Sequence, residues 1–192
     1  MRSLPERDTR PSAACHLPRV LRPVLALLAF TALSCTNHEP DVVQGLSLER
    51  FEGRWFEIAR IPRDYDRTCH DTTAEYRLTA PGHLEMTHRC HLDSTSGRVK
   101  EFRAKAEAED PAVAAKLTLD LGYYHGDYWV LAVGKDYEDA LIGHPSLSML
   151  WVLSRSPTLS ESRLSELEGL AERQGFGLKL LELTPQSGNE NP

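Results

Sequence analysis

The chain has 192 residues, 41% of them hydrophobic, and a formal net charge of −6. This length and apolar content suit one globular domain with additional segments. From Thr36 onward, 17 Lys and Arg stand against 26 Asp and Glu, a net charge of −9. So acidic a chain is a poor candidate for binding nucleic acid, or for binding an anionic membrane by electrostatics alone.

The first 34 residues differ from the rest of the chain. They carry five arginines against two acidic residues, followed by the apolar run VLALLAFTAL at 24–33. About ten residues are too few to span a bilayer, which takes roughly 20. A basic start, a short apolar centre and small residues after it are typical of a secretory signal peptide. We therefore predict a signal peptide over 1–34 rather than a buried helix.

Cys35 follows directly, in the stretch Ala32-Leu33-Ser34-Cys35. This stretch resembles the lipobox of bacterial lipoproteins, whose Cys is lipidated and becomes the new N-terminus. Ala32 stands where that motif usually has Leu, and the alternative is an ordinary cleavage site with Cys35 as a plain thiol. With lipidation, residues 35–45 become anchor and polar tether, and each buried CH₂ of the acyl chains contributes ~0.8 kcal/mol.

Short strand-like runs separated by turn residues follow. They cover residues 54–61, 72–78, 84–91, 100–108, 116–121, 127–133, 139–143 and 150–154. Their spacing is typical of an antiparallel meander. A meander of eight strands hides its edges by closing into a barrel, whose interior can hold one small ligand. The predicted fold class is therefore all-β, an eight-stranded antiparallel up-and-down barrel over 46–185.

One segment departs from the strand pattern. In residues 160–174 apolar side chains recur at three-to-four spacing, Ser160 can cap the start, and Gly175 is placed as a C-terminal stop. A single apolar stripe indicates a helix that packs on the outside of the barrel. Residues 178–183 can add a further strand, and 186–192 are expected to form a disordered tail.

Three short motifs accompany this strand series. Gly53-Arg54-Trp55 opens the first run, Lys135-Asp136-Tyr137 follows the sixth, and Leu153-Ser154-Arg155 closes the eighth. Each motif alone is weak, but together, with eight strands and a trailing helix, they resemble the three-region signature of the lipocalins. The stretches GRWFEIARIP, TTAEYRL, DYWVLAVGKDYEDALI and LWVLSRSPTLS are similar to the bacterial lipocalin and apolipoprotein D group. The resemblance covers 44–185, and Gly134-Lys135 stands where the wider family often has Thr.

Trp55 and Arg155 have a physical role in such a barrel. A barrel open at one end needs its other end shut, and a large flat side chain at a strand start can plug it. A guanidinium stacked on an indole face is worth ~0.5–2 kcal/mol. We assign Trp55 as the plug and Arg155 as its cover, which makes both residues structural.

The cysteines leave one pair in the exported domain. Cys15 is removed with the signal peptide, and lipidation uses Cys35, so Cys69 and Cys90 remain. In an oxidising compartment such a pair is expected to bridge, and related lipocalins carry a Cys just ahead of this strand. Two buried thiols are the alternative.

The stretch His88-Arg89-Cys90-His91 raises the question of a metal site. Residues three apart on a strand face opposite sides of the sheet. His88 and His91 therefore cannot reach one ion without a bulge, and we expect neither a metal nor a cofactor.

Alternation along the strands predicts which side chains face the interior. The candidate ligand-binding set is Ala74, Tyr76, Met86, His88, Phe102, Ala104, Trp129, Leu131 and Trp151, the last without an assigned face. Similarity to apolipoprotein D-like proteins also places Tyr76 in the cavity. A mostly apolar space with a few polar groups suits one small hydrophobic molecule, although Tyr76 and Trp129 can instead fill the barrel as an aromatic cluster. Glu57 and Arg60 fall on opposite faces and are not expected to pair.

The resemblance implies a carrier of fatty acids or lysophospholipids, with a role in lipid storage, transport or membrane repair under stress. Because no Asp follows Cys35, the lipoprotein motif favours the outer membrane of a Gram-negative bacterium, facing the periplasm. The alternatives are an envelope interaction module that uses the barrel exterior, and a lipocalin-fold isomerase, which needs a reactive cavity Cys. Neither G-x-S-x-G nor H-E-x-x-H occurs, which favours a non-enzyme. Monomer and homodimer both fit the sequence.

Overall fold

The computed structural model describes residues 39–122 and 125–187. The predicted signal peptide, Cys35 and residues 188–192 lie outside these ranges. In chain order the elements are α1 (Leu48–Phe51), β1 (Gly53–Arg60), β2 (Cys69–Ala80), β3 (His83–Leu92), β4 (Val99–Ala108), η1 (Pro111–Val113), β5 (Lys116–Asp120), β6 (His125–Val133), β7 (Asp139–Gly143), β8 (Leu150–Ser154), α2 (Glu161–Arg173), η2 (Leu178–Leu180) and β9 (Glu182–Leu183).

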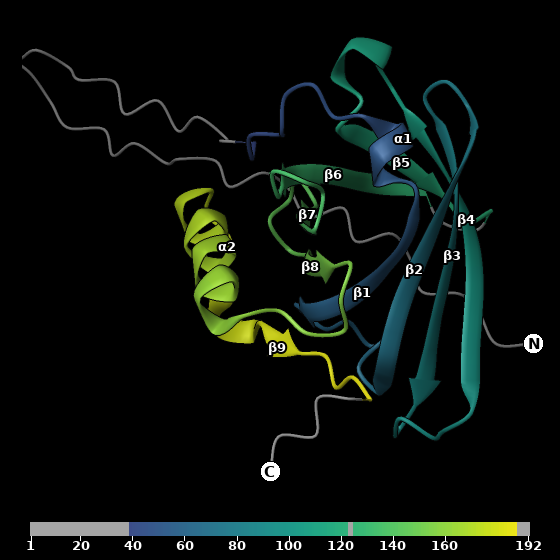
Figure 1. Ribbon diagram of the computed structural model, residues 1–192, viewed down its shortest axis with the longest axis vertical. Helices are drawn as coiled ribbons and strands as arrows, with labels where there is room; N and C mark the ends of the chain where they lie inside the picture. The colour runs from purple at the N-terminus through teal and green to yellow at the C-terminus, as the bar shows by residue number, and fades with distance from the viewer. Residues whose placement is uncertain (1–38, 123–124, 188–192) are drawn as a thin grey trace, which may run out of the picture. The chain divides into compact units, whose positions relative to one another are not determined.

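The strands form one antiparallel sheet that closes on itself. Its order is β2-β3-β4-β5-β6-β7-β8-β1, and β1 pairs in turn with β2, so no free edge is left between the two ends of the sheet. Figure 1 shows β1 between β2 and β8, with α1 at the end where β1 begins. The prediction of an eight-stranded antiparallel barrel with an external helix is confirmed.

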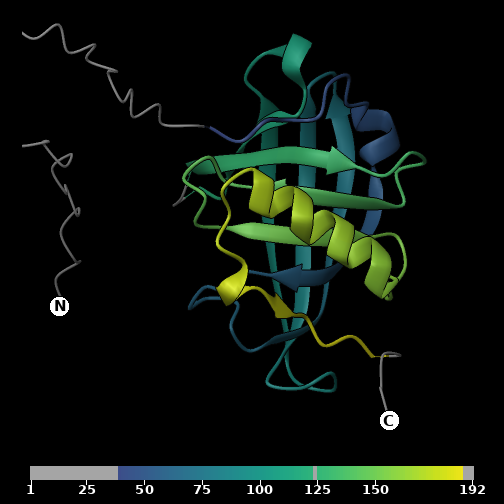
Figure 2. The same cartoon turned by 90° about the vertical axis from the view of Figure 1, so that its left-hand side faces the viewer.

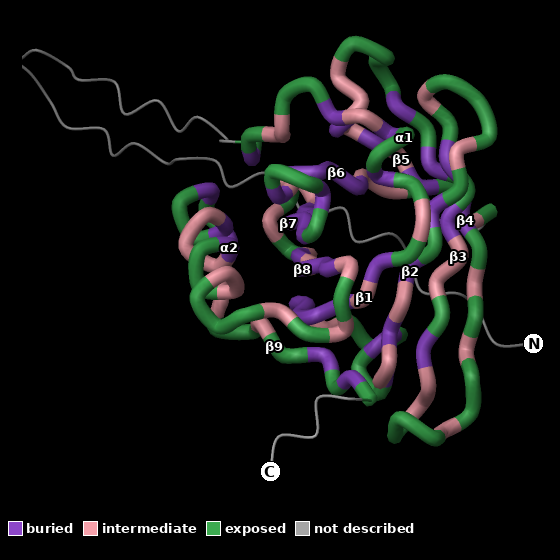
Figure 3. The backbone as a smooth tube through the Cα atoms, in the orientation of Figure 1, coloured by how far each residue is buried: buried purple, intermediate pink, exposed green. Residues whose placement is uncertain are grey.

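Apolar side chains pack on both sides of the barrel wall. In Figure 3 buried residues, in purple, recur along the strands. The interior cluster includes Trp55, Ala74, Tyr76, Met86, Ala104, Leu117, Tyr128 and Ile142. A second cluster lies between the outer face of the wall and α2, which crosses the strands in Figure 2. It contains Leu167 and Ala171 of the helix together with Phe176. Strands under the helix are therefore apolar on both faces.

Helix α2 begins and ends where the sequence predicts. The Ser160 hydroxyl accepts a hydrogen bond from the Arg163 backbone amide, as an N-cap residue does. At the other end Gly175 has φ of +95°, a left-handed conformation that glycine adopts without a steric penalty.

The segment after α2 closes a seam between β1 and β2. The two strands pair only over Gly53–Phe56 of β1, whereas Ala59 and Arg60 pair with β9. Beyond β9, the buried Gln186 side chain donates hydrogen bonds to the Glu57 carbonyl, at 2.8 Å, and to the Thr72 carbonyl, at 3.0 Å. The prediction that disorder begins at residue 186 is therefore wrong for Gln186, because its amide supplies donors that this seam requires.

The predicted tether is partly packed. The backbone amide of Val43 donates to the Val130 carbonyl of β6 at 3.0 Å, and Val42 packs against both apolar clusters. Within the described residues, the segment from Pro40 therefore lies on the barrel rather than free of it.

Candidate ligand-binding site

The end of the barrel where β1 begins is shut by Trp55. This side chain has no exposed surface, and its indole nitrogen donates to the Phe51 carbonyl at 2.8 Å. The Arg155 guanidinium lies 3.9 Å from the centre of the Trp55 rings, which is cation–π stacking. Arg155 also donates to the carbonyls of Arg50, Glu52 and Arg54, at 2.8–2.9 Å. The stack expected from the sequence is present. Through these hydrogen bonds Arg155 also holds the turn before β1 in place.

The other motif residues gather around this stack. Gly53 has φ of +97°, and a Cβ there would stand 3.2 Å from a terminal nitrogen of Arg155, so a side chain would meet both strain and crowding. The Tyr137 hydroxyl accepts from the Ser47 amide at 2.8 Å, and its carbonyl accepts from the Arg155 side chain. Asp136, in contrast, is exposed. The three sequence motifs thus build one closed floor.

Most of the predicted inward side chains do face the interior. Ala74, Tyr76, Met86 and Ala104 belong to the interior cluster. His88 stacks on Phe102, with 4.5 Å between ring centres. Burial lowers the pKa of His88 to about 4, and the charges of Lys100 and Arg60 lower it further in the same direction. His88 is therefore a neutral imidazole near neutral pH.

Trp151, which the sequence assigns to neither face, packs against the interior cluster. Its ring lies 5.6 Å from that of Tyr128, which the candidate set omits. The part of the interior away from the floor, here called the upper interior, is therefore aromatic: it holds Tyr128, Trp151, His88 and Phe102.

Two predicted lining residues face the other way. Trp129 and Leu131 belong to the outer cluster beneath α2, whereas Tyr128 and Val130 point inward. The prediction that Trp129 and Leu131 face the cavity is wrong because β6 is apolar on both faces, so alternation of hydrophobicity cannot reveal its inner side. The outer position of Trp129 is supported by Lys116, whose ammonium lies 3.8 Å from its ring centre. The signal in the sequence was the apolar stripe of 160–174, which requires an apolar outer face on the strands beneath it.

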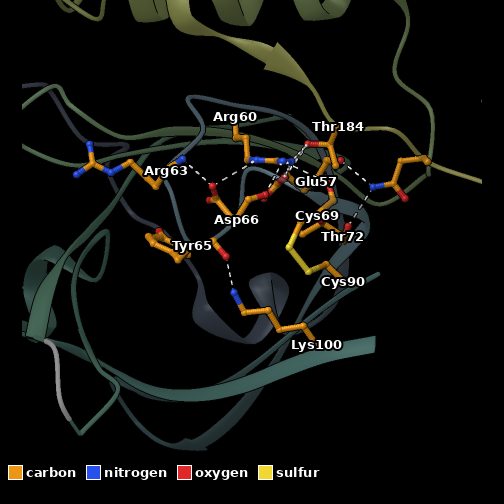
Figure 4. The surroundings of a disulfide bond; sticks show 11 residues. Glu57, Arg60, Arg63, Tyr65, Asp66, Cys69, Thr72, Cys90, Lys100 and Thr184 are labelled. Carbon is orange, nitrogen blue, oxygen red and sulfur yellow. Dashed lines mark hydrogen bonds and ion pairs between the residues drawn. A yellow bond between two sulfur atoms is a disulfide. The ribbon is translucent and has the colours of Figure 1, made fainter. Parts of the chain in front are cut away.

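The end of β1 opposite Trp55, here called the mouth, holds buried charges (Figure 4). Arg60 donates to the Glu57 carboxylate at 2.7 Å, to the Asp66 carbonyl at 2.7 Å and to the Cys69 carbonyl at 3.3 Å. Burial raises the pKa of both Glu57 and Asp66, and the Arg60 charge opposes that shift. The expectation that Glu57 and Arg60 do not pair is wrong, because a register shift between Glu57 and Ala59 brings them to one face.

The loop after β1 is fastened at the mouth. Asp66 accepts from the Arg63 amide at 2.6 Å, and Lys100 of β4 donates to the Tyr65 carbonyl. The predicted disulfide between Cys69 and Cys90 is present and joins β2 to β3 beside these contacts (Figure 4).

The described residues offer neither a metal cluster nor a membrane-spanning helix. Across 39–122 and 125–187, no three His, Cys, Asp or Glu side chains are grouped so as to hold a metal ion. No helix within those ranges is long and apolar enough to cross a membrane.

This barrel is shut at one end, and aromatic and polar side chains point into its upper interior. Such an arrangement is typical of β-barrel proteins that hold one small ligand. The chain matches the model of the Lipocalin-like domain family over residues 46–186, which is most of its length. It therefore belongs to the lipocalin-like family, whose members bind small hydrophobic ligands.

Relatives of this chain include a plant protein and a bacterial protein. Temperature-induced lipocalin-1 of Arabidopsis thaliana is 35% identical over 156 residues, covering 78% of this chain and 84% of the plant protein. Outer membrane lipoprotein Blc of Citrobacter freundii is 30% identical over 180 residues, 88% of this chain and 99% of that protein. Among solved structures, insecticyanin of Manduca sexta superposes with a TM-score of 0.59 at 19% identity, over 76% of this chain and 84% of its own. That likeness shows the fold.

Proposed function

We propose that this protein is a carrier for fatty acids or lysophospholipids, held in the upper interior of the barrel. One observation carries the proposal. His88, Phe102 and Trp151 point inward from three different strands, yet each keeps part of its surface accessible. We interpret this surface as facing an internal space that opens at the mouth. A floor shut by Trp55 makes that space a container rather than a channel.

The composition of the interior suits an acyl chain. Small side chains, those of Ala74, Ala104 and Ala106, stand among the aromatic rings of the interior cluster. Each CH₂ that moves from water into this environment contributes ~0.8 kcal/mol, so chain length sets most of the affinity. Lys100, on the same face of β4 as Phe102 and close enough to lower the pKa of His88, supplies a positive charge for an acidic head group at the mouth.

The proposed location is the periplasmic face of the outer membrane. Four bacterial relatives are named outer membrane lipoproteins, and Cys35 stands in a lipobox-like sequence. Lipid anchoring through Cys35 would hold the barrel beside the membrane. The proposed role is storage, transport or repair of membrane lipids under stress.

The proposed function has no chemical step. An isomerase on this scaffold needs a free thiol in the cavity, and the two cysteines of the described residues are joined as a disulfide. A thiol titration of the folded, oxidised protein tests this. We expect no reactive thiol once Cys35 is acylated, and one reactive thiol would favour the isomerase.

Native mass spectrometry of the protein purified from its own envelope, followed by lipid extraction, tests the carrier proposal. We expect one bound fatty acid or lysophospholipid per chain and a mass that includes the acyl groups on Cys35. If the envelope protein is empty and the delipidated protein binds no fluorescent fatty acid or lysolipid, the carrier proposal fails. An interaction module that uses the barrel exterior would then be favoured.

A further inference from the structure

Two tyrosines meet across the interior of the barrel. In the closed sheet, β2 and β6 are separated by three strands on either side, so they lie opposite each other. Tyr76 of β2 and Tyr128 of β6 point inward, with 1% and 6% of their surfaces exposed. Their hydroxyl oxygens are 2.5 Å apart and share one hydrogen bond. We call this pair the crossbar, because it connects opposite walls.

Aromatic rings lie on both sides of the crossbar. On one side, the Tyr76 ring lies 5.0 Å from Phe51, whose ring in turn lies 4.8 Å from Trp55. On the other side, the Tyr128 ring lies 5.6 Å from Trp151. In the register of the sheet Tyr76 stands opposite Gly53, two residues deeper than Ala74, which stands opposite both Trp55 and His88. The crossbar therefore lies at the inner end of the space that His88 and Phe102 face.

One of the two hydroxyl protons of the crossbar has no acceptor. Two hydroxyl groups carry two protons, and one hydrogen bond between them uses only one. Among the residues that the structure describes, neither hydroxyl has a second hydrogen-bond partner. Burial raises the pKa of both tyrosines, so both keep their protons at neutral pH. One buried O–H donor is left without an acceptor, and buried donors in folded proteins are nearly always paired.

We propose that the crossbar donates this second proton to an acceptor oxygen of the bound ligand, and so forms the inner end of the ligand site. The acceptor chemistry is a neutral carbonyl, as in a ketone or an ester. A carboxylate fits less well, because no Lys or Arg side chain within the described residues hydrogen bonds to either hydroxyl, and a buried charge without a partner is costly. The inference rests on the proposed carrier function and narrows it: among acyl ligands whose acidic head group lies at the mouth, the carrier prefers those with a neutral carbonyl oxygen near the inner end of the chain.

A matched pair of small probes tests the crossbar. 2-Acetylnaphthalene and 2-ethylnaphthalene have the same ring system and nearly the same shape, and only the first carries an acceptor oxygen. Their affinities are measured by calorimetric titration of the delipidated full domain, in wild type, Tyr76→Phe, Tyr128→Phe and the double variant. Tyr137→Phe is the matched control, because it removes a hydroxyl that bonds to Ser47 at the floor instead. Near-ultraviolet circular dichroism checks that each variant is folded.

We expect the wild type and Tyr137→Phe to prefer the ketone by about two- to tenfold, the range of one neutral hydrogen bond. The double variant should lose this preference while its affinity for 2-ethylnaphthalene stays the same. Single variants should keep part of the preference, since each retains one hydroxyl that can donate. Equal binding of both probes by the wild type, or a preference that survives in the double variant, overturns the crossbar proposal alone. If the wild type binds neither probe, the crossbar site is rejected, whereas the carrier function fails only if fluorescent fatty acids and lysolipids do not bind either.

Discussion

At the scale of single residues, Trp55 and Trp151 have opposite roles although both lie in the barrel. Trp55 is fully buried in the floor, between Phe51 and Arg155. Trp55 has no free donor for a ligand, because its indole nitrogen already donates to the Phe51 carbonyl and Arg155 stacks on its rings. Truncating a buried aromatic side chain removes its packing and leaves a cavity. The cost of losing Trp55 therefore falls on stability rather than on binding.

We predict that Trp55→Ala lowers the free energy of unfolding by about 3–5 kcal/mol and leaves ligand affinity per folded molecule unchanged. Urea denaturation measures the first quantity, and fluorescent fatty acid titration under native conditions measures the second. The matched variant Trp151→Ala should show the reverse pattern, with a smaller loss of stability and weaker binding. Full stability of Trp55→Ala together with lost binding would overturn the floor assignment.

His88 makes stability depend on pH. Its imidazole has an ordinary pKa of 6.5 and a pKa of about 4 in the folded protein. Between these values the unfolded chain binds the proton and the folded chain does not, so stability falls as the pH drops from 6.5 towards 4. Below about pH 4 both states are protonated and the loss is complete.

We predict that His88→Gln removes this part of the acid sensitivity, about 1–3 kcal/mol between roughly pH 7 and pH 4. Urea denaturation at a series of pH values measures it. The exposed His83 provides the control, because His83→Gln should retain the wild-type pH dependence. An unchanged slope in His88→Gln would mean that the imidazole is solvated in the folded state.

At the scale of elements, α2 is fastened to the barrel by one ion pair at its first turn. Arg163 donates from two nitrogens to the two carboxylate oxygens of Asp139, each at 2.8 Å. Asp139 is only 5% exposed, so Arg163 takes the place of the water that would otherwise solvate its carboxylate. Removing one member of such a pair leaves an uncompensated buried charge.

We predict that Arg163→Met costs about 3 kcal/mol of stability, and that adding Asp139→Asn recovers part of it. Thermal or urea unfolding of the single and double variants measures the coupling. Arg173→Met, a like substitution at an exposed site on the same helix, should change stability little. Equal effects of the two arginine substitutions would show that α2 is held by its apolar stripe alone.

How far the sequence predicts the site depends on whether an element has one polar face. Strand β4 alternates strictly, and the inward placement of Phe102 and Ala104 follows from that alternation. Strand β6 is covered on both sides, and its inner face could not be chosen from the pattern. The pairing of Glu57 with Arg60 was missed for another reason: the register shift in β1 depends on pairing with β8, which is a tertiary property.

At the scale of the whole molecule, the architecture was predictable because several independent signals agree. Eight strand runs, one amphipathic helix and three motifs all indicate the same barrel. The seam between β1 and β2 was not predictable, because it joins distant parts of the chain through the polar side chains of Thr184 and Gln186. A polar C-terminal segment looks like a tail in sequence until its partners are known.

The seam leads to a prediction about the C-terminus. Deleting residues 182–192 removes β9, Thr184 and Gln186, which leaves the Glu57 and Thr72 carbonyls without their donor and Arg60 without one of its acceptors. Hydrogen exchange of backbone amides should then accelerate in residues 57–60 and in the first residues of β2, because local opening costs less there. The pairing of β3 with β4 does not involve the C-terminal segment and should keep its protection. Deleting only 188–192 is the control and should leave exchange unchanged. Equal protection in both truncated chains would mean that β1 and β2 hold the seam without the C-terminal segment.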